Sequence, residues 1–188
     1  MRIPMLMLSL DEARSLAAAI KEIEASTDRG AAIIAGAFVE DHLRTALRGR
    51  LRQDKPILDE MFNSYGPLSS FSTKIKLAYL IGVISEETAS DLDYIRKIRN
   101  KFAHRTEIDS FSSPPVKDWA MNLTLVDRFN MEIAATRDSR GITVTASFID
   151  ENNRPLLKTP RGRFVLTCQC LLSMFTLDEP PALDLPAF

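Results

Sequence analysis

Residues 85–105 read SEETASDLDYIRKIRNKFAHR, and this stretch decides the fold. Ser85 can cap a helix, and the acidic pair that follows it lies at the positive end of the helix dipole. Apolar residues then recur at helical spacing, at Leu92, Ile95, Ile98 and Phe102. The pattern predicts a helix that runs to about His104 and turns one stripe toward a core.

Two helices are predicted at the start of the chain. A capping box at residues 9–12 begins the first, which runs to about Ser26. The pair Thr27-Asp28 begins the second, which runs to about Arg52 and carries a broad apolar stripe. A broad stripe is typical of a helix with several neighbours, so we expect the second helix to be central.

Two more helices are predicted before residue 85. Pro56 opens a short helical turn that ends near Met61. After a turn cluster, Ser69 or Ser70 can cap a helix over residues 71–83. That helix is apolar on most of its faces, which predicts that it is buried.

The second half of the chain is less regular. We expect one helix over 114–138, a strand or extended segment over 142–149, and a last helix over 160–175. Residues 178–188 are rich in proline and acids and predict a flexible tail. The sequence therefore predicts an all-α fold, a single bundle of about six helices within residues 1–177.

The composition of the chain excludes some classes of function. The chain has 188 residues and a net charge of −1, with 24 basic and 25 acidic residues. A dedicated duplex-DNA-binding protein usually carries a basic excess, so we do not expect direct binding to duplex DNA. No stretch is long and apolar enough to span a membrane. The closely spaced Cys168 and Cys170 are expected to be free thiols in the reducing cytoplasm.

Motifs for cofactors and metals are missing from the sequence. There is no Gly-rich phosphate loop, no G-x-S-x-G and no H-E-x-x-H. Two histidines and two cysteines that diverge on a helix make a poor zinc site. We therefore expect no metal and no cofactor.

Five basic side chains crowd the end of the helix predicted over 85–104. They are Arg96, Lys97, Arg99, Lys101 and Arg105. One interpretation is structural, because cations near a helix C-terminus complement its dipole by ~0.3–1 kcal/mol each. In that case Asp91 and Asp93 would pair with Arg96 and Lys97. The other is a phosphate site, since guanidinium groups suit phosphate and His104 can move protons. The residues alone leave both open.

The spacing within this cluster restricts its chemistry. Asn100 and His104 lie four residues apart and share a helix face. Arg99 lies about 140° from His104 on a continuous helix, at ~100° per residue. They converge only if the helix ends near Ala103 or if two chains meet across a two-fold axis. A homodimer would supply two histidines, one as base and one as acid.

Residues 40–42, on the second predicted helix, hold further candidates. Glu40 or Asp41 can reach across the bundle to orient Arg99 or His104. His42 lies at the edge of the apolar stripe, and we expect it to be structural.

Four stretches of the chain resemble the mannitol-operon-repressor family. They are 28–33 (DRGAAI), 40–43 (EDHL), 66–79 (GPLSSFSTKIKLAY) and 95–104 (IRKIRNKFAH). The likeness is strongest over residues 25–125. It implies an all-helical regulatory protein of the cytoplasm that acts through a protein partner or as a homodimer. It also implies no helix-turn-helix.

The run Arg99–His104 also resembles the Arg-x4-His signature of the HEPN superfamily. That resemblance implies a metal-independent endoribonuclease or an RNA-binding module, with Arg99, Asn100 and His104 as the catalytic residues. The cations that would bind phosphate or RNA are Arg96, Lys97, Lys101 and Arg105. The two resemblances are compatible, but they differ on mechanism.

Overall fold

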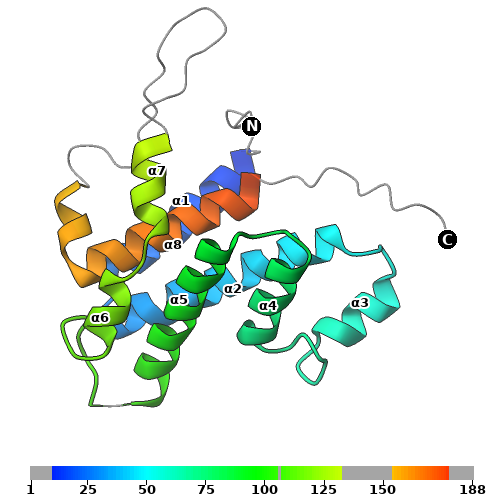
Figure 1. The fold of residues 1–188 in the computed structure, drawn as a ribbon, viewed down its shortest axis with the longest axis horizontal. Helices are drawn as coiled ribbons and strands as arrows, with labels where there is room; N and C mark the ends of the chain where they lie inside the picture. Colours follow the sequence, from blue (N-terminus) through cyan, green and yellow to red (C-terminus); the bar gives the residue numbers. More distant parts are fainter. Residues whose placement is uncertain (1–9, 106, 133–153, 178–188) are drawn as a thin grey trace, which may run out of the picture.

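The computed structural model describes residues 10–105, 107–132 and 154–177, and every regular element in these ranges is helical (Figure 1). The elements are α1 (Leu10–Ala25), α2 (Asp28–Arg50), α3 (Lys55–Phe62), α4 (Phe71–Leu80), α5 (Glu86–His104), α6 (Val116–Met121), α7 (Leu125–Glu132), the 3-10 helix η2 (Arg154–Lys158) and α8 (Pro160–Leu177). The predicted all-α class is confirmed. The expected strand over 142–149, the Ser9 cap and the tail over 178–188 lie outside the described residues.

Helix α2 lies at the centre of the bundle, as its broad stripe predicts, and contacts α1, α4, α5 and α8 (Figure 1). Its first half buries small residues at Ala31, Ala32 and Ala35, which lets neighbouring helices approach closely. Its second half buries the larger side chains of Val39, Leu43 and Leu47. The central helix therefore contributes small residues to the core at its start and large ones toward its end.

Helix α8 completes the core from the other side and packs on α1, α2, α6 and α7. Its side chains are buried around most of its girth, including Phe164, Cys168 and Leu171. Neither this helix nor any other in the described part of the chain is long and apolar enough to cross a membrane.

Three helices begin at capping residues that the sequence predicts. The side-chain oxygen of Thr27 accepts the amide of Gly30 at 3.2 Å. Ser70, rather than Ser69, caps α4, and Ser85 caps α5, each by accepting the amide three residues later. Local capping therefore sets the starts of α2, α4 and α5.

The end of α4 differs from the prediction. The helix stops at Leu80 instead of residue 83, because Gly82 takes a left-handed conformation with φ of 72°. The amides of Gly82 and Val83 then donate to the carbonyls of Tyr79 and Ala78, which is a Schellman motif. The predicted burial is wrong at this end, because Tyr79, Leu80 and Ile81 are exposed.

The helix predicted over 114–138 is interrupted in the structure. It is divided into α6 and α7 by residues 122–124. The buried carboxylate of Asp91, on α5, accepts the amides of Thr124 at 2.9 Å and Leu125 at 2.7 Å, and so caps α7 from another helix. Burial raises the pKa of Asp91, and these hydrogen bonds partly offset the rise. The expected pairing of Asp91 with the cations of α5 is therefore wrong.

The end of α5 is held by a side chain from the first turn of α2. Arg29 donates to the carbonyl oxygens of Phe102, Arg105 and Ile108, the last at 2.5 Å. A helix C-terminus has carbonyls without intrahelical partners, and a cation there also complements the dipole. Arg29 therefore fixes the part of α5 that carries His104.

The neighbouring residue, Asp28, connects the loop after α5 and helix α8 to the first turn of α2. Its carboxylate accepts the amide of Phe111 at 2.9 Å and pairs with Arg161 of α8 at 2.5 Å. Arg161 also donates to the carbonyl of Ser26, at the end of α1, at 2.7 Å. The start of α2 thus ties α1, α8 and the loop after α5 together.

We predict that Asp91→Ala lowers the free energy of unfolding by roughly 1–3 kcal/mol, because two backbone amides lose their acceptor. The matched control is Asp93→Ala, which removes pairs with Arg96 and Lys97 near solvent and should cost under ~1 kcal/mol. Urea denaturation followed by circular dichroism measures both. Equal losses would contradict the role of Asp91 as the cap of α7.

Candidate functional site

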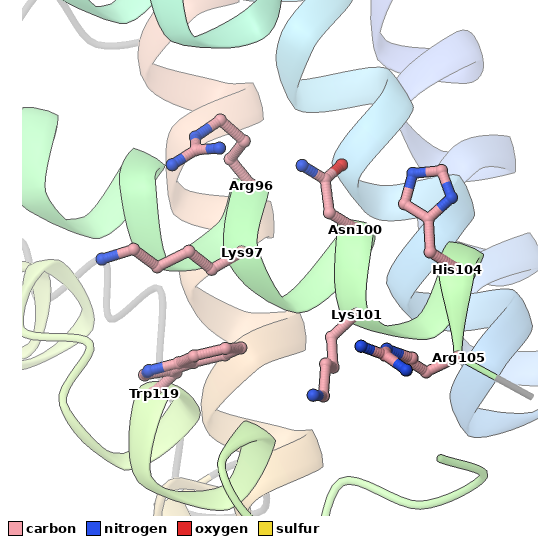
Figure 2. Close-up of a pocket in the computed structure, with 7 residues that line it drawn as sticks. All are labelled: Arg96, Lys97, Asn100, Lys101, His104, Arg105 and Trp119. Carbon is pink, nitrogen blue, oxygen red and sulfur yellow. The ribbon is translucent and has the colours of Figure 1, made fainter. Parts of the chain in front are cut away.

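An open pocket of about 280 Å³ lies against the last turns of α5, beside α6 (Figure 2). Two rows of α5 side chains, each with a spacing of four residues, and one residue of α6 line it. The first row is Arg96, Asn100 and His104, the second is Lys97, Lys101 and Arg105, and Trp119 comes from α6. Figure 2 shows the indole on the side of the second row and Arg105 directed back toward Lys101.

The structure brings together six of the seven site residues that the sequence predicts on α5. Asn100 and His104 share a face as their spacing predicts, and the four flanking cations line the same pocket. Arg99 does not, because α5 continues through His104 instead of ending near Ala103. Within one chain, the expected trio of Arg99, Asn100 and His104 is therefore divided between two sides of the helix.

Arg99 is half-buried between α5, α2 and α4. Its Nη1 donates to Oε2 of Glu40 at 2.6 Å, and its guanidinium lies over the ring of Phe71, 5.5 Å from the centroid. Its Nε donates to Oδ1 of Asn100 at 3.3 Å. Arg99 is therefore held by Glu40 and touches the pocket only through Asn100.

Glu40 binds a second cation on the same side. Lys74, which is only 4% exposed, donates to Oε1 of Glu40 at 2.6 Å and to the carbonyl of Ser69 at 2.8 Å. Of the two acids that the sequence offers, Glu40 contacts Arg99, whereas Asp41 pairs at the surface with Arg44 at 2.5 Å. Glu40 thus links α2, α4 and α5 through one ionic cluster.

The pocket cations differ in how far they are already neutralised. Asp93 pairs with Arg96 at 2.6 Å and with Lys97 at 2.8 Å. Burial alone would raise the pKa of Asp93, but the hydrogen bonds from Lys97 and Arg96 outweigh it and lower that pKa. Arg105 and Glu107 are 3.8 Å apart. Within the described residues, Lys101 has no ion pair.

The other titratable candidates are structural. Nδ1 of His42 lies 2.9 Å from the carbonyl of Phe38, one turn earlier in α2, as expected of a structural histidine. Both cysteines are free and buried, and burial raises the pKa of Cys168 well above its ordinary value and that of Cys170 to about 12. In the described ranges, no three His, Cys, Asp or Glu residues converge as metal ligands.

Two residues of this region are not recognised from the sequence. Trp119, on α6, is half-buried against the core and also lies at the pocket wall. Gly36 of α2 is buried, and a Cβ there would lie 2.9–3.0 Å from Cβ, Cγ and Cδ of Arg99. A glycine inside an Ala-rich helix is the available signal for such a close approach.

Residues 27–174 match the family model described as the mannitol repressor. The chain belongs to the mannitol repressor family. The matched range runs from the cap of α2 into α8. Both the pocket and the Glu40 cluster of this family member therefore lie within the range that matches the family model.

Solved structures show the same fold as this mannitol repressor family member. One is MtlR in the MtlR–HPr complex of Escherichia coli, with a TM-score of 0.59 and 18% identity, covering 86% of this chain and 98% of that one. Another is YggD of Shigella flexneri, described as a possible transcriptional regulator, with a TM-score of 0.60 and 13% identity, covering 85% and 98%. No curated protein matches this chain.

We predict that Gly36→Ala destabilises this mannitol repressor family member by roughly 1–3 kcal/mol, because the new methyl group meets the stem of Arg99. Gly49→Ala is the matched control, since Gly49 is exposed on the same helix and alanine favours helices by up to ~1 kcal/mol. Thermal unfolding should show opposite signs for the two variants. A stable Gly36→Ala protein would contradict the close packing of Arg99 on α2.

Proposed function

We propose that this member of the mannitol repressor family is a cytoplasmic regulator that acts by binding a protein partner. The observation that carries the proposal is the likeness to MtlR, a protein solved in complex with HPr, over 98% of that chain. HPr is therefore the first partner to test. The net charge of −1 favours a protein partner over duplex DNA, since DNA binding relies on spread cations.

The end of α4 is the surface that we assign to this partner. Three consecutive large side chains are exposed there, Tyr79 at 47%, Leu80 at 77% and Ile81 at 40%. The turn at Gly82 holds them outside the core. Contiguous apolar side chains at a surface are typical of protein-binding sites, because their burial against a partner is favourable.

We predict that Leu80→Ser weakens binding to the HPr of this protein's own host by about tenfold or more, since roughly 1.5–3 kcal/mol of apolar burial is lost. The matched control is Leu156→Ser, which removes another exposed leucine, on η2, and should leave the affinity unchanged. Isothermal titration calorimetry measures both. If the wild-type protein does not bind HPr, that partner is wrong; if both variants bind equally well, the interface lies elsewhere.

A metal-independent ribonuclease is a second candidate function, favoured by one observation. Asn100 and His104 line the same pocket with several cations, and Arg99 is hydrogen-bonded to Asn100. One chain presents a single histidine there, whereas acid–base cleavage of RNA uses two proton-transfer groups. This function therefore requires a homodimer that places two copies of the pocket together.

The ribonuclease candidate predicts that single-stranded RNA is cut in the presence of EDTA and that His104→Ala abolishes the cutting. His104 is exposed, so the variant should keep its stability to within ~0.5 kcal/mol. Gel analysis of labelled RNA and sedimentation of the protein test the activity and the dimer together. RNA that stays intact with the wild-type protein would exclude this candidate.

A further inference from the structure

The polar groups that line the pocket between α5 and α6 are almost all hydrogen-bond donors. Arginine and lysine side chains only donate hydrogen bonds, and the indole of Trp119 also only donates. None of the lining residues is an acid. A lining of this kind recognises a group rich in acceptors and carrying negative charge.

Asn100 is oriented to add to this set of donors. Its Oδ1 accepts the Nε of Arg99, so its amide N–H groups are left to point elsewhere. Arg99 cannot turn away, because Glu40 holds its Nη1 at 2.6 Å. Figure 2 shows the Asn100 side chain projecting between Arg96 and His104, in the first row of the pocket. The half-buried ionic cluster of Glu40, Lys74 and Arg99 thus sets the polarity of one pocket residue.

The charge of the pocket suits one dianion. The lining contains four permanent cations, and the adjacent acids Asp93 and Glu107 neutralise two of them. Two positive charges remain, one shared by Arg96 and Lys97 beside Asp93 and one on Lys101, toward which the Arg105 side chain is directed (Figure 2). A phosphomonoester carries ≈ −1.5 to −2 charge near pH 7 and three acceptor oxygens, which matches this remainder.

Trp119 gives the pocket an apolar wall beside the cations. The indole is half-buried and lies on the side of Lys97 and Lys101 (Figure 2). Sugar rings and nucleobases both pack against aromatic faces, so the organic part of a phosphomonoester can lie there. At about 280 Å³, the pocket is near the lower end of the ~300–1,000 Å³ typical of small-molecule sites.

We propose that this pocket binds the phosphomonoester of a small molecule. The phosphate lies between Lys101, Arg105 and His104, and the organic part packs on Trp119. A polynucleotide fits less well, because its phosphates need cations spread along a path and the remaining charge here is a single cluster. The site goes beyond partner binding at α4 and does not depend on it.

The chain provides its own reporter for this site, because Trp119 is its single tryptophan. We expect saturable changes in tryptophan fluorescence with glucose 6-phosphate or adenosine 5′-monophosphate, and none with glucose or adenosine. Inorganic phosphate shows whether the phosphate suffices alone. If only one of the two organic esters binds more tightly than inorganic phosphate, that identifies the source of the phosphate as a sugar or a nucleotide.

Matched variants test whether the phosphate binds at Lys101 and Arg105. Lys101→Gln and Arg105→Gln should each weaken binding by about tenfold, the loss expected for one charge-assisted hydrogen bond. Lys76→Gln, an exposed lysine on α4, should change nothing. Trp119→Phe should still bind by calorimetry without the fluorescence signal. Circular dichroism confirms that each variant is folded.

Three results would overturn the proposal. The first is no response to any phosphomonoester up to roughly 10 mM, above the ~1 mM of weak metabolite sites. The second is an equal loss of affinity in the Lys76→Gln control. The third is a response to single-stranded RNA alone, which would assign the pocket to RNA. Binding of HPr is measured separately, so its failure leaves this test unaffected.

Discussion

The packing of this chain depends on the first turn of α2, where Asp28 and Arg29 hold the ends of other segments. Arg29 binds the last carbonyls of α5, and Asp28 binds Arg161, which in turn binds the end of α1. A cation at a helix N-terminus opposes the helix dipole, so this position is favourable only because distant carbonyls accept its hydrogen bonds. The end of α5, and the pocket on it, rely on that contact.

A second constraint is the half-buried carboxylate of Glu40, which binds both the buried Lys74 and the half-buried Arg99. Buried ionic groups add little net stability once desolvation is counted, but removing one partner leaves a buried charge uncompensated. The cluster therefore fixes geometry: Gly36 makes room for Arg99, and Arg99 is held against Glu40 while the other cations of α5 line the pocket. One helix thereby presents an ionic side to the core and a donor-rich side to a ligand.

The two proposed binding surfaces both arise where helices end. Tyr79, Leu80 and Ile81 are exposed beside the Gly82 turn that ends α4, and Trp119 of the short helix α6 lies against the end of α5. Helix α5 packs against both α4 and α6, so it connects the two surfaces. In a regulator of the mannitol repressor family, the proposed phosphomonoester site lies at the C-terminal end of α5 and the proposed partner surface lies just before its start. Single substitutions can therefore remove one function and leave the other.

The sequence by itself determined the all-α class, the caps at Thr27 and Ser85, the central α2 and the face shared by Asn100 and His104, because each depends on helical spacing or on a bond between residues a turn apart. Only the tertiary structure decided the break before α7, the exposed end of α4 and the pairing of Arg99 with Glu40. Residues distant in the sequence cause the first and the last of these. At the end of α4, the turn at Gly82 is a local feature. Which apolar side chains remain exposed there depends on how the other helices pack, and the residue spacing along one helix carries no information about that packing.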